Sequence, residues 1–386
     1  MKSPKGINKM PFFQKLSLFL GVLMLPYMLL MTGLLSFRNN IVLNGAGGSF
    51  PYPLYSKWFF EYTKIDPSVH FNYQPIGSGG GIQQLISQTI DFAGSDSPLP
   101  DTLISGKEKK IIHIPTVAGA VVIAFNLPRI PTLCLDKDIL GAIFLGEISR
   151  WNDPRIAALN PNIALPNLPI VVIHRSDGSG TTYIFTEYLS KISPSWARTS
   201  GKGTSVYWQR GIGAKGNAGV AATLKTIPGS IGYLELAYAL QNKFPMAAVK
   251  NQAGEYVLPS LQSVAQSFPT DLNRDDFRIS LTDSPRAGAY PIAGLTWILL
   301  NTQTTNRTTM EYLSQFLSWA LTEGQSFALP LDYAPLPFAL RQKVLTVLET
   351  LKRKNPLSMY SWEWRLFSLL SGNEKNLQYA DYFKNR

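Results

Sequence analysis

The segment 170–189, IVVIHRSDGSGTTYIFTEYL, contains the three parts of one α/β unit. Ile170 to Ile173 is a β-branched run typical of a buried strand, and a polar, glycine-rich turn follows it. Beyond the turn, apolar residues recur at Ile184, Tyr188 and Ile192, the spacing of one helix face. The segment therefore predicts a strand, a tight turn and a helix, which is the repeating unit of an α/β fold.

The same alternation of β-branched runs and amphipathic stretches occurs along most of the chain, without an internal repeat. The predicted elements are strands at 41–43, 69–73, 91–94, 111–114 and 121–125, and helices from about Pro53, from about Gly81 and near 138–144. Proline-rich sequence at 160–169 and polar, glycine-rich sequence at 200–219 predict two long surface loops.

Composition limits the class of protein. The chain has 386 residues, of which 45% are hydrophobic and 16% charged, so it is too apolar for a disordered protein and long enough for two cores. The single cysteine, Cys134, excludes an intrachain disulfide and a cysteine-based zinc cluster. The formal charge of +11 favours an anionic partner. Nucleic acid is not expected, because the basic residues are dispersed.

The N-terminal residues 1–36 predict an export signal. Four lysines without any acid precede an apolar run from Leu16 to Phe37. This run is longer than the usual signal core of about 7–15 residues, so an uncleaved membrane anchor is the alternative. Cleavage near Ser36 is favoured, since Ile41 already begins a predicted strand and an uncleaved segment would press the domain against the membrane.

The C-terminal extension, 361–386, predicts an amphipathic helix. Trp362, Leu366 and Leu369 recur at helical spacing before Gly372. We expect this helix to pack on its own domain, and contact with a membrane or a partner is the alternative.

Two further glycine-rich turns lie, like DGSG, at the start of a predicted helix. They are NGAGGSFP at 44–51 and GSGGG at 77–81. A helix start exposes unpaired N–H groups and the positive end of the helix dipole, glycine lets an anion approach the backbone, and serine or threonine adds a hydroxyl donor. Three such turns together predict an anion site, whereas each alone also fits an ordinary capped helix. None has the sequence of a nucleotide-binding loop.

Two charged residues refine this prediction. Arg175 ends the strand before the third turn, where its planar guanidinium can bind an oxyanion through two bonds and Asp177 can orient it; the alternative is a surface ion pair. Asp96 precedes Pro98 and either shapes a turn or faces the anion. A carboxylate beside an anion is reasonable only if the anion carries a proton.

The sequence predicts no catalytic residue, metal or cofactor. Its three histidines, His70, His113 and His174, are isolated in strand-like sequence, which indicates structural roles. It contains neither a GxSxG elbow nor an HExxH motif. The enzymatic alternative is a phosphate-ester hydrolase or phosphotransferase that uses Ser179.

Eight ordered stretches carry a resemblance to a known family. They are NGAGGSFP, YQPIGSGGG, DFAGSDSPL, FLGEISRWNDP, RSDGSGTTYIFTEYL, GAKGNAGV, PGSIGYLELAYA and LDYAPLP. In this order they resemble the phosphate-binding proteins of bacterial high-affinity phosphate ABC transporters, from about Val42 to Tyr360. The resemblance implies a periplasmic receptor that binds inorganic phosphate and delivers it to an inner-membrane permease and ATPase. A monomer is expected.

The resemblance also implies the fold and the site. The fold is α/β, of the type II periplasmic-binding-protein kind, with two lobes and two crossover hinges near Asn126 and Ile298. Lobe one comprises 41–126 plus 299–386, and lobe two comprises 127–298. The implied phosphate ligands are Ser49, Phe50, Ser78, Asp96, Arg175, Ser179, Gly180 and Thr181. Gly79 and His174 depart from the family pattern, in which a serine and an arginine are common.

Overall fold

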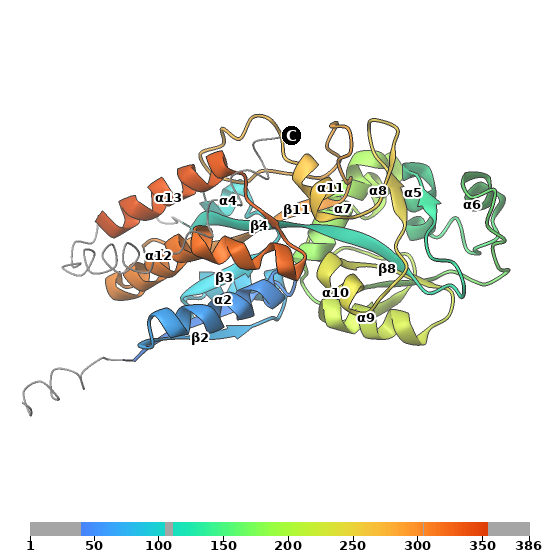
Figure 1. Cartoon of the computed structure of the whole chain (residues 1–386). Helices are drawn as coiled ribbons and strands as arrows, with labels where there is room; N and C mark the ends of the chain where they lie inside the picture. The colour runs from blue at the N-terminus through green and yellow to red at the C-terminus, as the bar shows by residue number, and fades with distance from the viewer. Residues whose placement is uncertain (1–39, 105–110, 304, 354–386) are drawn as a thin grey trace, which may run out of the picture.

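The computed structural model describes residues 40–104, 111–303 and 305–353 (Figure 1). The predicted signal peptide at 1–36 and the extension at 361–386 lie outside these residues. Figure 1 shows two α/β groups side by side, one containing α2, α12 and α13 and the other containing α5 and α7 to α10. No helix in the described ranges combines the length and apolar character needed to cross a bilayer.

The described strands form a nine-stranded and a three-stranded sheet. The larger has the order β2-β1-β3-β11-β4-β8-β6-β7, with β12 paired to β4, and the smaller has the order β10-β9-β5. The strands are β1 (Ile41–Gly47), β2 (Val69–Gln74), β3 (Phe92–Ser95), β4 (Ile111–Phe125), β5 (Cys134–Leu135), β6 (Val171–Arg175), β7 (Ile212–Ala214), β8 (Ser230–Glu235), β9 (Ala248–Lys250), β10 (Tyr256–Val257), β11 (Ala293–Asn301) and β12 (Ala334–Pro335).

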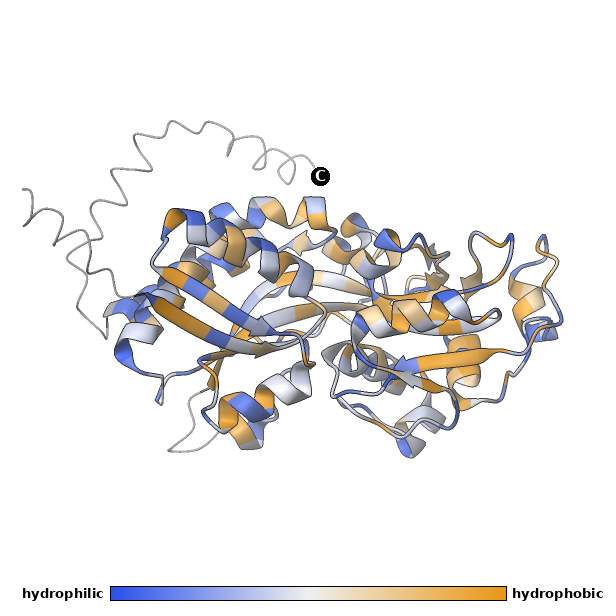
Figure 2. Ribbon diagram, turned by 90° about the horizontal axis from the view of Figure 1, so that it is seen from below, coloured by the Kyte–Doolittle hydropathy of each residue, from blue (hydrophilic) through white to orange (hydrophobic). Residues whose placement is uncertain are grey.

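Helices cover these sheets. The helices are α2 (Tyr52–Ile65), α3 (Ser78–Ile86), α4 (Asp101–Ile104), α5 (Lys137–Leu145), α6 (Pro154–Leu159), α7 (Gly180–Ile192), α8 (Pro194–Thr199), α9 (Gly216–Thr226), α10 (Leu236–Gln241), α11 (Leu261–Gln266), α12 (Arg307–Leu321) and α13 (Phe338–Arg353), with 3-10 turns η1 (Glu323–Phe327) and η2 (Leu329–Leu331). In Figure 2 many helices carry hydrophobic and hydrophilic residues on different faces, as expected for helices that pack on a sheet.

Strand β4 corrects the prediction of two separate strands at 111–114 and 121–125. It is one strand of fifteen residues that pairs with β11 along its first part and with β8 along its last part. Pro115 and Gly119 look like strand breakers in the sequence. The pairing register shifts beside Pro115, and such an irregularity tolerates a missing N–H. A Cβ at Gly119 would collide with the Phe50 ring, so glycine makes room for that side chain.

The loop predicted over 200–219 is shorter in the structure. Strand β7 and the start of α9 lie inside it. Strand β7 has only three residues and α9 begins with Gly-Asn-Ala-Gly, so neither has an apolar pattern that marks it in the sequence.

The core contains large side chains, and two of its tryptophans have their polar atom paired. The indole N–H of Trp58 donates to the carbonyl of Gly324 at 2.6 Å, and that of Trp151 donates to the carbonyl of Gly229 at 2.8 Å. Both side chains are fully buried. Such pairing lets tryptophan bury its apolar surface without leaving a donor unsatisfied.

Strand β1 provides a matched test of this core. Leu43 is fully buried, whereas the neighbouring Val42 is 53% exposed. We expect Leu43→Ala to lower the free energy of unfolding by about 2–5 kcal/mol, because a buried leucine leaves a cavity. Val42→Ala should change it by less than about 1 kcal/mol. Urea denaturation of both ligand-free variants measures the difference, and equal losses would place Leu43 outside the core.

Candidate functional site

The three predicted turns meet beside the carboxyl ends of β1, β3 and β6, of which β1 and β3 are parallel neighbours. Backbone hydrogen bonds join them: Gly77 N–H donates to the carbonyl of Gly47 at 2.8 Å, and Gly79 N–H donates to that of Gly178 at 2.8 Å. Gly48 N–H also donates to the carbonyl of Gly94, at the end of β3, at 2.9 Å. Segments far apart in the chain therefore form one closed cluster, where ligands of open α/β sheets commonly bind.

Asp96 lies inside this cluster and is 1% exposed. Its Oδ2 accepts a hydrogen bond from the Ser78 hydroxyl at 3.4 Å, and its own N–H donates to Ser78 Oγ at 3.1 Å. Its Oδ1 is buried and accepts no hydrogen bond from the described residues. Burial raises the pKa of Asp96 to about 7, although the nearby hydroxyls of Thr296 and Ser78 and the charge of Arg175 oppose the rise. One buried acceptor atom is thus left for a proton donor.

Arg175 is 4% exposed and is held by two neighbours. Its Nε and Nη2 donate to Oδ1 and Oδ2 of Asp177 at 2.7 and 2.5 Å, and its Nη1 donates to Thr181 Oγ1 at 3.3 Å. Burial favours a higher pKa for Asp177, but the bonds from Arg175 outweigh burial and lower that pKa. The ion pair with Asp177 exists, and it is buried rather than on the surface. It fixes the guanidinium plane in the site.

The start of α7 supplies backbone donors. Ser179 caps the helix through its hydroxyl, which accepts from the N–H of Thr182 at 3.0 Å. Gly180 and Thr181, the first helical residues, are buried. A Cβ at Gly180 would collide with Ser78 Oγ and Asp96 Oδ2, so only glycine allows this close approach. The positive end of the helix dipole therefore lies beside Asp96.

The first turn brings Ser49 and Phe50 to the same place. Ser49 is 6% exposed, and its Oγ accepts hydrogen bonds from the backbone N–H and the side-chain amide of Asn217 at 3.3 and 3.1 Å. The Phe50 ring is fully buried, and the carbonyl of Phe50 accepts from Tyr333 Oη at 2.6 Å. All eight predicted ligand residues thus lie in one buried cluster.

Sequence reasoning missed three polar residues of this cluster. Asn217 contacts both Ser49 and Thr181. Tyr238 donates to the carbonyl of Ser49 at 2.9 Å, and Tyr333 contacts Phe50. Each belongs to a stretch quoted for the family resemblance, GAKGNAGV, PGSIGYLELAYA or LDYAPLP, and that membership is the signal that could have found it.

The two departures from the family pattern differ in place. Gly79 lies in the contact between turns, where a Cβ would come 3.1 Å from the Cα of Gly178, a tight approach for any larger residue. The His174 ring stacks on Trp208 with centroids 5.0 Å apart, and its Nδ1 lies 3.0 Å from the carbonyl oxygen of Arg175. His174 therefore packs beside the site.

The other histidines have surroundings that suit structural roles. His113 is buried, and its Nε2 accepts the N–H of Leu99 at 3.0 Å. Burial lowers the pKa of His113 to about 4, so its ring is neutral. His70 is exposed on β2. Among the described residues, no three His, Cys, Asp or Glu side chains are grouped closely enough to hold a metal ion.

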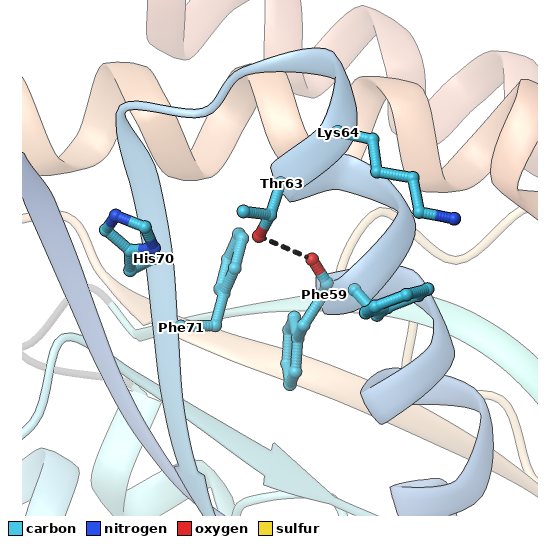
Figure 3. A pocket seen from close by; sticks show the side chains of 6 residues that line it. Phe59, Thr63, Lys64, His70 and Phe71 are labelled. Atoms are coloured by element: carbon cyan, nitrogen blue, oxygen red, sulfur yellow. Dashed lines mark hydrogen bonds between the residues drawn. The ribbon is translucent and has the colours of Figure 1, made fainter.

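Two hollows border the described part of the chain at different places. The first lies between α2 and β2 on the surface and is lined by Phe59, Phe60, Thr63, Lys64, His70 and Phe71 (Figure 3). It contains none of the cluster residues. The second, of about 270 Å³, borders Asp96 and is also lined by residues of α7, β11 and the segment 274–282. Only the second therefore adjoins the site.

The arrangement suits an oxyanion that carries a proton. Hydroxyls, a guanidinium and helix N–H groups are donors, and they surround a position where negative charge is stabilised. Asp96 Oδ1 is the acceptor in this set of donors. Since a proton-free anion offers nothing to that atom, the site matches an ion with at least one hydrogen.

Comparison with known proteins gives a consistent result at the level of sequence. Residues 38–323 match the family model that is described as the PBP superfamily domain. The chain is 44% identical over 315 residues to the phosphate-binding protein PstS of Haemophilus influenzae, covering 81% of this chain and 93% of that protein. It is 37% identical over 314 residues to the phosphate-binding protein PstS of Methanocaldococcus jannaschii, covering 74% and 80%.

Solved structures agree on the fold. An ancestral soluble variant of the human phosphate-binding protein has a TM-score of 0.62 at 22% identity, over 79% of this chain and 93% of that one. A high-affinity periplasmic phosphate-binding protein with bound phosphate has a TM-score of 0.60 at 22% identity, with the same coverage. The predicted α/β fold of the type II periplasmic-binding-protein kind is confirmed.

Proposed function

The chain belongs to the family of PstS phosphate-binding proteins, and from this premise we propose that it binds inorganic phosphate in the periplasm and delivers it to an ABC transporter for import. The observation that carries the proposal is Asp96 Oδ1, a buried acceptor atom without a partner among the described residues. Near neutral pH phosphate retains a proton that can be donated to this atom.

We assign the phosphate ligands as predicted. Ser49, Ser179 and Thr181 donate hydroxyl bonds, and Ser78 does so when its hydrogen turns from Asp96 Oδ2 to the ion. Phe50 and Gly180 donate backbone N–H bonds, Arg175 donates from its guanidinium, and Asp96 accepts. Support for this set is its convergence, since the eight residues come from four segments and are all buried in one cluster. Many charge-assisted bonds in a site without water bind an anion strongly.

The transport role implies a location and partners. We propose that residues 1–36 direct export, that the folded part works in the periplasm as a monomer, and that an inner-membrane permease and its ATPase are the partners. A putative phosphate ABC transporter substrate-binding protein from Clostridium perfringens, solved with phosphate, has the same fold at a TM-score of 0.56. We also propose the division into lobes 41–126 plus 299–386 and 127–298, which close over the ion by hinge motion.

The receptor role is favoured over the hydrolase or phosphotransferase role. Ser179, the nucleophile of that alternative, uses its hydroxyl oxygen to cap α7 by accepting the N–H of Thr182. No histidine contacts Ser179 in the described residues, and none of the relatives named above is described as an enzyme. A serine without a base is a poor nucleophile.

Calorimetry on phosphate-stripped protein tests the proposed function. We expect one phosphate to bind per chain and to be recovered unchanged, because the oxygen of Ser179 caps α7 and no histidine contacts Ser179 in the described residues. Incubation with a chromogenic phosphate monoester is the control for turnover. The absence of phosphate binding, or steady release of product from the ester, would refute the proposal.

Arg175 and His174 form a matched pair of neighbours. Arg175→Ala removes a buried guanidinium from the anion and should cost about 2–5 kcal/mol of phosphate binding energy. His174→Ala removes a ring stacked on Trp208 and should change phosphate affinity by less than threefold, roughly 0.6 kcal/mol. Equal small effects in calorimetry would show that Arg175 does not contact the ion.

Asp96 is expected to discriminate phosphate from sulfate. Sulfate brings no proton, so Asp96 must take one up when sulfate binds. Because its pKa is about 7, sulfate affinity should level off below pH 7 and fall by about tenfold per pH unit above it. At pH 8, phosphate should be preferred at least about tenfold, the cost of taking up one proton one pH unit above the pKa of Asp96.

Asp96→Asn tests this assignment. The amide can donate to sulfate, so the preference for phosphate should largely disappear and sulfate binding should no longer depend on pH. Asp91→Asn is the control, since Asp91 Oδ2 accepts the N–H of Asn44 outside the site. Sulfate titrations from pH 6 to 8.5 decide the point, and an unchanged selectivity ratio in Asp96→Asn would remove Asp96 from this role.

A further inference from the structure

We infer that Asn217 is a positioning residue that orients the hydroxyl hydrogens of Ser49 and Thr181 toward the bound anion. The inference rests on the proposed function, because it explains how two neutral side chains become obligatory donors. It arises from the hydrogen bonds of one fully buried amide at the start of α9.

Ser49 Oγ has both of its lone pairs occupied. The backbone N–H of Asn217 donates to it at 3.3 Å, and the side-chain Nδ2 of Asn217 donates to it at 3.1 Å. A serine hydroxyl has two acceptor positions and one donor hydrogen. With both acceptor positions used by Asn217, the hydrogen is available only as a donor.

Thr181 Oγ1 is in the same state. It accepts from Arg175 Nη1 at 3.3 Å and from Asn217 Nδ2 at 3.3 Å. Both donors approach a hydroxyl that is fully buried. Its hydrogen is therefore also directed away from Asn217 and Arg175.

The orientation of the Asn217 amide is fixed by a third bond. Its Oδ1 accepts the backbone N–H of Glu235 at 3.1 Å. A backbone N–H can only donate, so the oxygen of the amide must face Glu235 and the NH₂ group must face the two hydroxyls. One amide thus uses its oxygen and both of its hydrogens, and neither Ser49 nor Thr181 can turn its hydrogen toward it.

This arrangement suits an anion site in particular. A rotating hydroxyl can either donate or accept, and an anion benefits only from donation. Because Asn217 fills the acceptor positions in advance, the two hydroxyls need no reorientation when phosphate enters. Asn217 acts through Ser49 and Thr181 and does not itself contact the ion.

A double-mutant cycle tests the inference with inorganic phosphate as the ligand. We expect Asn217→Ala to weaken phosphate binding about 10- to 100-fold, the scale of hydrogen bonds to charged groups. In a Thr181→Val background, Asn217→Ala should weaken phosphate binding by at most one third of the factor seen in the native background. The reason is that one of the two hydroxyls that Asn217 orients is then absent. Thr181 is the informative partner, because Thr181 and Asn217 both lie in the proposed lobe 127–298. A change in the contacts between the two lobes therefore cannot make the effect of Asn217→Ala depend on Thr181.

Two controls separate orientation from folding. Asn160→Ala removes a buried amide that donates to the carbonyls of Cys134 and Ile156, so it should lower thermal stability without changing phosphate affinity. Asn217→Asp keeps the shape of the side chain and places an acid in the first turn of α9, which favours the helix. Its carboxylate accepts from both hydroxyls and adds a buried negative charge beside the anion, so this variant should lose at least as much phosphate affinity as Asn217→Ala.

The outcomes are distinct. Phosphate binding by the native protein with no loss in Asn217→Ala, or with a loss that is the same in the Thr181→Val background, overturns the role of Asn217 and leaves the proposed function intact. A native protein that does not bind phosphate overturns both. An Asn217→Asp variant that binds as well as the native protein also overturns the role of Asn217.

Discussion

A buried carboxylate oxygen without a partner is the constraint on which the rest of the site depends. Asp96 is 1% exposed, and its Oδ1 accepts no hydrogen bond from the described residues. An unsatisfied buried polar atom is costly, so a protein retains one where a ligand can pair with it. In the proposed function, the donors around Asp96 attract an anion, and Asp96 favours an anion that has a proton to share. Under this proposal, the donors respond to the charge of the ion, and Asp96 responds to the proton that the ion carries.

The fold holds the donors in fixed positions around Asp96. The three turns follow strands β1, β2 and β6 and lead into helices, and they are joined by backbone bonds such as that from Gly79 to Gly178. Strand β4 runs through both groups of strands, pairing with β11 and then with β8 (Figure 1). A site made from distant segments therefore rests on one sheet. Gly180 matters for the same reason, since any side chain there would hold the turns apart.

Much of the fold could be predicted from periodicity, and much of the site from resemblance. The strand, turn and helix around Arg175 follow from β-branched and helical spacing alone. The continuity of β4 could not be predicted, because Pro115 and Gly119 act as breakers in isolation and are accommodated only by a register shift and by the Phe50 ring. Asn217 was missed for a related reason: its partners Ser49 and Thr181 are distant in sequence, and only its place in the stretch GAKGNAGV marks it.

The direct test of the central claim is the position of hydrogen atoms in the phosphate complex, measured by neutron diffraction from deuterated crystals near pH 8. The account predicts a deuterium on a phosphate oxygen that is shared with Asp96 Oδ1, and hydroxyl deuteriums of Ser49 and Thr181 that point at phosphate while Asn217 donates to both oxygens. A bound phosphate with no deuterium between it and Asp96, or with Asp96 turned away from the ion, would contradict it.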